Sequence, residues 1–484
     1  MKKILIPLFL TGAITMTMSC KKNITDLNTN PTRPANVFSE NLFSNASVNL
    51  ADVMSSTNVN TNNFRLFVQY WTETIYRDET RYNLNQRSIS DRWFAAFYRD
   101  VIKDLTQASE LAEKEPLATG QMKNRKAINE ILIVYSYYTL LSTFGNIPYS
   151  EALDINNLQP IYDDAAEVFG KITTRLDEAL TQLDPSAPGY GSADLILNGN
   201  IEGWIRFGNS LKMRMGMLVA DVNPGVSKAM VEAAAPKVVS DNSENIIMNY
   251  LASPPNTNPV WEDLIQSGRH DYVAAKKFID TLKSLKDPRL PFYFDPTITT
   301  GTEFLGQNPG SGAVFNDFSA PSAKLSNPTF PFTFFSYSEM EFYKAEAVER
   351  GYAISGTAEE HYNNGIDASI QEWGGTAAQA LAYSTQPAVK YSTAMGTYKQ
   401  KIGLQSWIAL YNRGYDAWTQ WRRLDYPFLP VPSGALFADG EEPKVIVRMT
   451  YPVVEQNLNK TNYEAASAAV GKDQITQKLW FDKF

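Results

Sequence analysis

Residues 337–373 have the pattern of two consecutive amphipathic helices, and this pattern limits most strongly what the chain can fold into. Ser338 and Glu341 have the spacing of a capping box, and Thr357 and Glu360 repeat that spacing. Gly351 stands between them, where a helix end favours a left-handed residue. Such a pair cannot bury its apolar face alone. The sequence therefore predicts a mainly α fold of stacked, tetratricopeptide-like helical pairs, an alpha-alpha superhelix.

Further segments repeat the helical spacing of apolar residues. We expect helices at 93–108, 128–144, 165–183, 204–218, 398–412, 414–424 and 462–470. The segment 128–144 is apolar almost all round, which indicates a buried helix. It is too short, and too rich in Ser, Thr and Tyr, for a membrane span.

The stretch 249–335 interrupts this pattern. It is rich in Pro, Gly and Asn, and its aromatic residues follow no clear period apart from one expected helix at 272–285. Long segments without regular structure inside a compact protein are usually functional. We therefore interpret 249–335 as a loop-rich ligand-binding lobe, inserted into a single domain that spans 41–484.

The N-terminus has the pattern of a targeting segment. Lys2 and Lys3 precede an apolar stretch at 4–18 that is too short to span a bilayer. Cys20 follows directly and is the only cysteine of the chain. This arrangement resembles a bacterial lipoprotein cleavage site; the alternative is a plain secretory signal with an incidental cysteine. We predict a signal peptide at 1–19, lipidation of Cys20 that anchors the protein to a membrane, and a tether at 20–40.

Composition argues against several classes of function. A net charge of -8 disfavours general nucleic-acid binding, which needs basic surface. The two histidines have no partner at metal-ligand spacing, and neither a nucleophile elbow nor a phosphate-binding loop is present. We therefore expect no catalytic residue, no metal site and no cofactor. A calcium ion held by carbonyl groups and scattered acids stays open, because such a site leaves no sequence pattern.

Ligand binding is better supported by the side chains. Sugar rings have apolar faces and polar edges, so aromatic rings with a few placed polar groups suit them. Two stretches outside the clear helices have this mix, and the alternative for each residue is core packing. The candidate ligand-binding residues are Trp71, Tyr76, Arg81 and Tyr82 in the first stretch, and Trp261 and Tyr293 in the lobe. Arg422 and Arg423, by contrast, we expect to pair with acids or helix ends.

Several short patches occur in a characteristic order along the chain. They include Asp26-Leu27-Asn28, Asn209-Ser210-Leu211-Lys212-Met213-Arg214, Asp287-Pro288-Arg289-Leu290 and Trp418 through Trp421-Arg422-Arg423. With the lipoprotein signal, they make the chain resemble the SusD/RagB family, in particular its SusD-like lipoprotein branch. The resemblance implies four tetratricopeptide-like pairs that cradle a loop-rich ligand face. It also implies a non-catalytic lipoprotein of the outer membrane that faces the cell surface and binds an oligosaccharide or other nutrient. Its partner would be a SusC-like TonB-dependent transporter, to which it delivers the ligand.

Three alternatives remain at this point. A peptide-binding protein on the same scaffold would rely on long main-chain contacts rather than on stacking rings. A lipid-anchored interaction scaffold would hold another protein and no small ligand. A hydrolase would need two carboxyl groups placed across a sugar, a distance that sequence spacing does not define.

Overall fold

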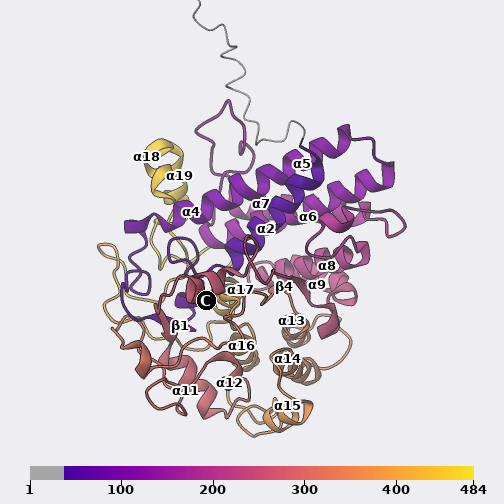
Figure 1. Cartoon of the computed structure of the whole chain (residues 1–484). Coiled ribbons are helices and arrows are strands. Elements are labelled where there is room, and N and C mark those ends of the chain that lie inside the picture. The colour runs from indigo at the N-terminus through magenta and orange to yellow at the C-terminus, as the bar shows by residue number, and fades with distance from the viewer. Residues whose placement is uncertain (1–36, 484) are drawn as a thin grey trace, which may run out of the picture. The chain divides into compact units, whose positions relative to one another are not determined.

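The computed structural model describes residues 37–483, and residues 39–483 belong to one compact unit. Helices dominate this unit, which confirms the predicted mainly α class (Figure 1). The longer helices are α2 (Ser39–Ser55), α4 (Ile89–Ala95), α5 (Lys103–Lys114), α6 (Thr119–Phe144), α7 (Ala165–Gln182), α8 (Ile201–Leu218), α9 (Pro224–Ala234), α11 (Lys276–Ser284), α13 (Tyr337–Glu349), α14 (Ala358–Glu372), α15 (Ala377–Ser384), α16 (Tyr398–Ala409), α17 (Gly414–Leu424), α18 (Val453–Leu458) and α19 (Lys460–Ala469). The short helices are α3 (Phe64–Phe67), α10 (Pro259–Trp261) and α12 (Leu290–Tyr293).

Helices that follow one another along the chain pack as pairs. The pairs α6 with α7, α8 with α9, α13 with α14 and α16 with α17 are in contact, and α13 also contacts α8 and α16. Helix α6 is buried along nearly all of its second half, as its apolar sequence predicts, and it is capped after Phe144 by Gly145, which has a positive φ of 89°. Pairs that share neighbours in this way build one continuous core.

Helix starts differ in part from the predicted caps. Thr357 and Glu360 form the expected capping box of α14. The N-cap of helix α13, however, is Ser336, two residues before the predicted cap Ser338, and Ser336 accepts the hydrogen bond from the backbone N–H of Glu339. Ser338 is occupied elsewhere, because its hydroxyl donates to the carbonyl of Gly365 at 2.6 Å.

Some elements depart from the expected helices. Helix α2 begins at Ser39, inside the predicted tether 20–40. Helix α9 starts at Pro224, capped by the side chain of Asn223, where we expected only the end of the preceding helix. In the lobe, the first residues of the predicted helix 272–285 form a strand, because they pair with a strand from the N-terminal part.

Two small antiparallel sheets tie the lobe to the helical scaffold. Strand β1 (Trp71–Glu73) pairs with β3 (Tyr272–Ala274), with Trp71 opposite Ala274 and Glu73 opposite Tyr272. Strand β2 (Ile246–Met248) pairs with β4 (Phe332–Phe335), which leads directly into α13. The β2–β4 sheet thus pairs the two ends of the lobe with each other, and the β1–β3 sheet ties the interior of the lobe to the N-terminal part.

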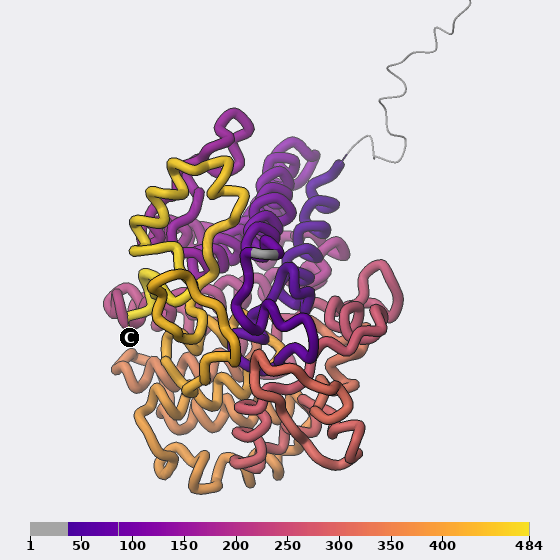
Figure 2. Tube along the Cα trace, turned by 90° about the vertical axis from the view of Figure 1, so that its left-hand side faces the viewer, coloured from indigo at the N-terminus to yellow at the C-terminus, as the bar shows by residue number. Residues whose placement is uncertain are grey.

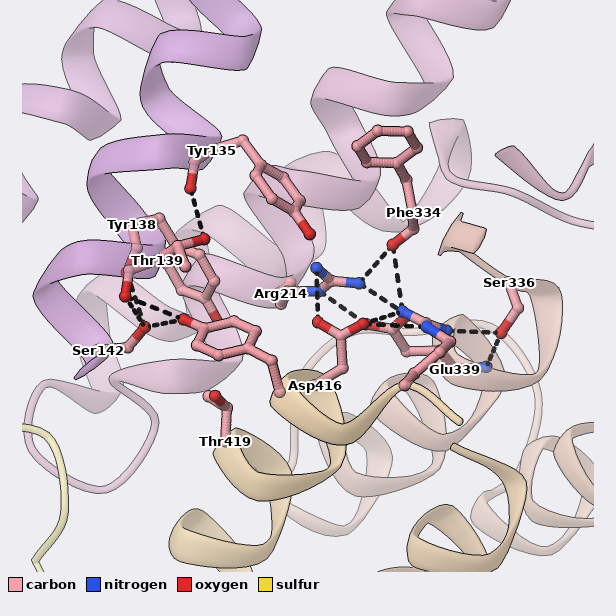
Figure 3. A network of polar contacts seen from close by, with 12 residues as sticks. Tyr135, Tyr138, Thr139, Ser142, Arg214, Phe334, Ser336, Glu339, Asp416 and Thr419 are labelled. Carbon is pink, nitrogen blue, oxygen red and sulfur yellow. Dashed lines mark hydrogen bonds and ion pairs between the residues drawn. The ribbon is translucent and has the colours of Figure 1, made fainter. Parts of the chain in front are cut away.

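A buried network of charges joins three of the helices (Figure 3). Arg214 of α8 lies 2.7 Å from Glu339 of α13 and 3.1 Å from Asp416 of α17. Arg413, just before α17, pairs with the same two carboxylates. All four side chains are at most 9% exposed, so each charge depends on the others for stabilisation.

The C-terminal segment packs against the N-terminal helices. Figure 2 shows it, in yellow, beside the indigo and purple helices, and the backbone N–H of Met449 donates to the carbonyl of Thr143 at 3.2 Å. Arg422 donates to the carbonyl of Ser142 at 2.6 Å, and Arg423 pairs with Glu346 at 2.6 Å. The structural roles predicted for both arginines are confirmed.

Candidate ligand-binding face

Four segments that are distant in the sequence meet beyond the end of the β1–β3 sheet. Thr74, which follows β1, donates from its backbone N–H to the carbonyl of Asp271 and from its hydroxyl to the carbonyl of His270, both at 2.8 Å. The N–H of Ala313 donates in turn to the carbonyl of Thr74 at 3.1 Å. We call the surface formed by residues 74–77, 264–271, 295–298 and 312–318 the loop face.

The loop face contains a small hollow with aromatic and aliphatic walls. Its volume is about 240 Å³, and Ile265, His270, Ile298, Phe315 and Phe318 are among the residues that line it. The rings of His270 and Phe315 lie with their centroids 4.5 Å apart. Ile265 and Ile298 are more than half exposed, so this apolar surface is open to a ligand.

Polar groups surround this apolar hollow. The guanidinium group of Arg269 pairs with the carboxylate of Asp271, and both residues line the hollow. The carboxyl group of Asp295 accepts from the N–H of Ala323 at 3.1 Å, and partial burial raises the pKa of this group. Apolar rings edged by hydrogen-bonding groups suit the apolar faces and hydroxyl edges of a sugar.

Three of the predicted ligand-binding aromatics lie in the core, so the structure contradicts those predictions. Trp71 is 1% exposed, and its indole N–H donates to the hydroxyl of Tyr411 at 2.9 Å. Tyr293 is fully buried, and its ring stacks on Tyr411 at 4.2 Å. Tyr82 is 4% exposed and packs edge-on against Phe67. Trp71 and Tyr293 pack between the lobe and the helices, Tyr82 packs against α3 and Phe437, and none of the three offers a free face to a ligand.

The other three predicted residues have different surroundings. Tyr76 is 64% exposed on the loop face, with a left-handed φ of 51° that turns the chain sharply after β1. Arg81 is half-buried, and its Nε donates to the carbonyl of Gly310 at 2.9 Å, which holds a neighbouring loop in place. Trp261 is half-buried at the end of α10. A direct role in ligand binding remains a prediction for all three.

Sequence reasoning missed most of the hollow. His270 looked like an ordinary surface histidine, and Phe318 had no helical or strand period to mark it. The signal that was available is composition, because both residues fall within the lobe 249–335 that was expected to carry the ligand face. Their meeting with Tyr76 depends on the β1–β3 pairing, which no local pattern specifies.

A depression beside α2 is larger than the hollow of the loop face, but its lining is chemically different. It has a volume of about 710 Å³, and α2, the segment 88–100 and the start of α10 line it. Its lining contains charged and small residues, such as Asp52, Asp91 and Arg92, and no aromatic ring. The loop face is therefore the better candidate for a ligand that stacks.

The described residues also bear on metal binding and on membrane insertion. No group of three or more His, Cys, Asp or Glu side chains among residues 37–483 is arranged to hold a metal ion. Within the same residues, no helix has the length and apolar character needed to cross a bilayer. Cys20, the predicted lipidation site, lies outside the described residues.

Comparison with known proteins identifies the family. A SusD-like family, described as starch-binding and associating with the outer membrane, matches residues 31–452. No curated protein sequence matches the chain. A solved chitin-binding protein is 26% identical, with a TM-score of 0.77 over 92% of this chain and 100% of its own.

Two further solved structures share the fold. A chitin-binding SusD homolog from Flavobacterium johnsoniae is 23% identical, with a TM-score of 0.77 over 92% of this chain and 98% of its own. A SusD homolog from Bacteroides uniformis is 24% identical, with the same TM-score over 93% of this chain and 100% of its own. Both likenesses agree with the tetratricopeptide-like helical class predicted from the sequence. The chain therefore belongs to the SusD-like family, whose members are outer-membrane-associated binding proteins rather than enzymes.

Proposed function

We propose that this protein captures an oligosaccharide at the cell surface and delivers it to a SusC-like TonB-dependent transporter of the outer membrane. One observation carries the proposal: His270 and Phe315 line an exposed hollow beside Arg269 and Asp271. The exposed Tyr76 follows closely on Thr74, which is hydrogen-bonded to the backbone of His270 and Asp271. Aromatic rings contribute large contact areas at little cost in conformational entropy, and the charged groups can bind hydroxyls.

The ligand class follows from the same chemistry. The hollow is small, so it would hold one or two sugar units, while the exposed ring of Tyr76 would extend the contact along a longer chain. The 26% identical relative is described as chitin-binding, and the family as starch-binding. Chitin-derived and starch-derived oligosaccharides are therefore the first ligands to test.

Lipidation of Cys20 would hold the protein at the membrane. Burial of each acyl CH₂ contributes about 0.8 kcal/mol, so several chains are needed for a stable anchor. The segment between Cys20 and the first described helix would then let the body reach the transporter. With the anchor in the outer leaflet, the loop face would be exposed to extracellular glycans.

Calorimetric titration tests the proposal. We expect heat of binding from at least one oligosaccharide series, with affinity that rises with chain length up to the span of the loop face. A mixture of extended peptides should give no heat. Binding of the peptides alone would support the peptide-binding alternative. A membrane protein that co-purifies, in the absence of heat from every ligand, would support the interaction scaffold.

A further inference from the structure

A further cavity, which we call the second cavity, lies where α14 and α16 end beside the β2–β4 sheet. It is separate from the hollow of the loop face and from the depression beside α2. Its volume is about 360 Å³, and Asn242, Phe330, Thr333, Glu372 and Asn412 are among its lining residues. Sites for small ligands have volumes from about 300 Å³ upward, so the cavity is large enough for one sugar ring. It differs from the hollow on the loop face, with which it shares no lining residue.

The carboxyl group of Glu372 is the most unusual feature of this cavity. Glu372 is the last residue of α14 and lines the cavity, and none of the described hydrogen bonds or ion pairs between residues 37 and 483 involves its carboxyl group. Burial raises the pKa of this group, although the charges of Arg413 and Lys324 oppose the shift. The carboxyl oxygens are not among the fully buried atoms without a partner, so they face the open space of the cavity and are accessible to a ligand that supplies donors.

The nearby cations do not supply these donors. The ammonium group of Lys324 donates to the carbonyl of Trp373 at 2.6 Å. Arg413 donates to Asp416 and Glu339 in the buried network. Lys324 nevertheless balances the charge of Glu372, so the cavity as a whole does not favour a cationic ligand over a neutral one.

A second acceptor also lacks a donor. The side-chain N–H of Asn242 donates to the carbonyl of Ala368 at 3.0 Å, but its buried Oδ1 accepts no hydrogen bond from the described residues. Phe330 adds an apolar wall, since its half-buried ring lies 5.7 Å from that of Trp373. The cavity thus combines an accessible carboxyl group and one buried acceptor without a donor with an aromatic surface.

We propose that this cavity is a second ligand site, which binds a neutral polyol the size of one monosaccharide through hydroxyl donors to Glu372 and Asn242. One segment borders both sites: Ala323 and Ser326 line the hollow of the loop face, whereas Lys324 and Phe330 line the second cavity. The proposal does not depend on the loop face being the glycan site.

Titration with glucose and with N-acetylglucosamine tests this site. We expect the wild-type protein to bind at least one of them with a Kd in the millimolar range, about 4 kcal/mol of binding free energy. Glu372→Ala should weaken that binding at least about tenfold, since a hydrogen bond to a charged group is lost. Ser243→Trp should abolish it, because this exposed residue lines the cavity and a large ring there would block it.

Tyr76→Ala serves as the matched control, since it alters the loop face and leaves the second cavity intact. We expect it to keep monosaccharide binding within about twofold. Thermal melting checks that each variant is folded. If Glu372→Ala does not fold, the surface variant Ser243→Trp still tests the proposal. The proposal is overturned if neither monosaccharide binds at about 10 mM, well above a millimolar Kd. It is also overturned if both cavity variants bind as the wild type does, or if Tyr76→Ala alone removes binding.

Discussion

Two neighbouring aromatic residues, Trp71 and Tyr76, have opposite surroundings, and this contrast decides which of them can bind a ligand. Trp71 lies on β1 with its ring against the guanidinium group of Arg65, at 5.3 Å. Tyr76, five positions later, projects from the turn and is 64% exposed. The buried ring of Trp71 therefore has a structural role, whereas the exposed ring of Tyr76 can contact a ligand. The neighbouring residues in the sequence do not reveal this difference.

Substitution of these two residues should give opposite results. Tyr76→Ala is expected to lower glycan affinity by about 1–3 kcal/mol, as for an aromatic hot spot, with stability changed by less than about 0.5 kcal/mol. Trp71→Ala should destabilise the fold by about 3–5 kcal/mol, because it leaves a large cavity. Calorimetry and urea denaturation measure the two effects. A Tyr76→Ala variant that binds glycan as the wild type does would remove Tyr76 from the site.

A buried pair of carboxyl groups lies beneath the same turn. Burial is the largest cause that raises the pKa of Glu73 to about 9, and the neighbouring Glu79 adds to the shift. Thr80 donates to Glu73 from its N–H at 2.9 Å and from its hydroxyl at 2.8 Å. Arg87 pairs with Glu79 at 3.1 Å, so Glu73 is the member of the pair that stays protonated at neutral pH.

Stability should therefore fall as pH rises. The carboxyl group of Glu73 retains its proton in the folded state. In the unfolded chain the same group loses its proton above its ordinary pKa of 4.5. Its contribution is fully present below that value and is lost as pH rises towards 9, at up to about 1.4 kcal/mol per pH unit. Glu73→Gln should flatten this slope in denaturation experiments between pH 5 and about 9. The exposed control Glu110→Gln on α5 should not, and equal slopes in both variants would contradict this account.

At the scale of elements, the charge network fixes how α8, α13 and α17 pack. Removal of one partner leaves the others buried without full compensation. We expect Arg214→Ala to lower the free energy of unfolding by about 3–5 kcal/mol. In the control, Lys460→Ala breaks an exposed pair with Glu464 on α19 and should cost less than about 0.5 kcal/mol. Urea denaturation compares the two; similar losses would show that the network does not hold the helices together.

The bounds of a helix were predictable where the local sequence pattern alone determines where the helix begins and ends. Helix α17 begins and ends as expected at Gly414 and Leu424, because its apolar spacing is regular. The start of α13 was not predictable, since Ser336 and Ser338 both precede a glutamate by three residues. The choice between them depends on a partner outside the helix, the carbonyl of Gly365. Strand β3 was missed for a similar reason, because its partner β1 is distant in the sequence.

At the scale of the whole molecule, the candidate site is assembled from segments that only tertiary pairing brings together. The sequence indicated the lobe 249–335 by its composition and marked Tyr76 by its neighbours, but could not show that the rings of His270 and Phe315 lie in contact. The fold class followed from repeated helical spacing, whereas the site required the path of several loops. Most of the fold was therefore accessible beforehand, whereas of the six candidate ligand-binding residues only Tyr76 lies exposed on the loop face.

The anchor and the partner can be tested in cells. We expect Cys20→Ala to release the protein from the membrane fraction, and mass spectrometry of the wild type to show acylation at Cys20. The wild-type protein should co-purify with a TonB-dependent transporter under mild detergent. A protein that remains in the membrane fraction after the Cys20→Ala change would contradict the lipid anchor.

The most direct test of the account is a crystal structure of the protein with a bound oligosaccharide, chosen from the series that gives heat in calorimetry. The account predicts sugar rings across the loop face, in contact with Tyr76 and with the adjacent rings of His270 and Phe315. Sugar density over another surface, such as the charged depression beside α2, with an empty loop face, would contradict it.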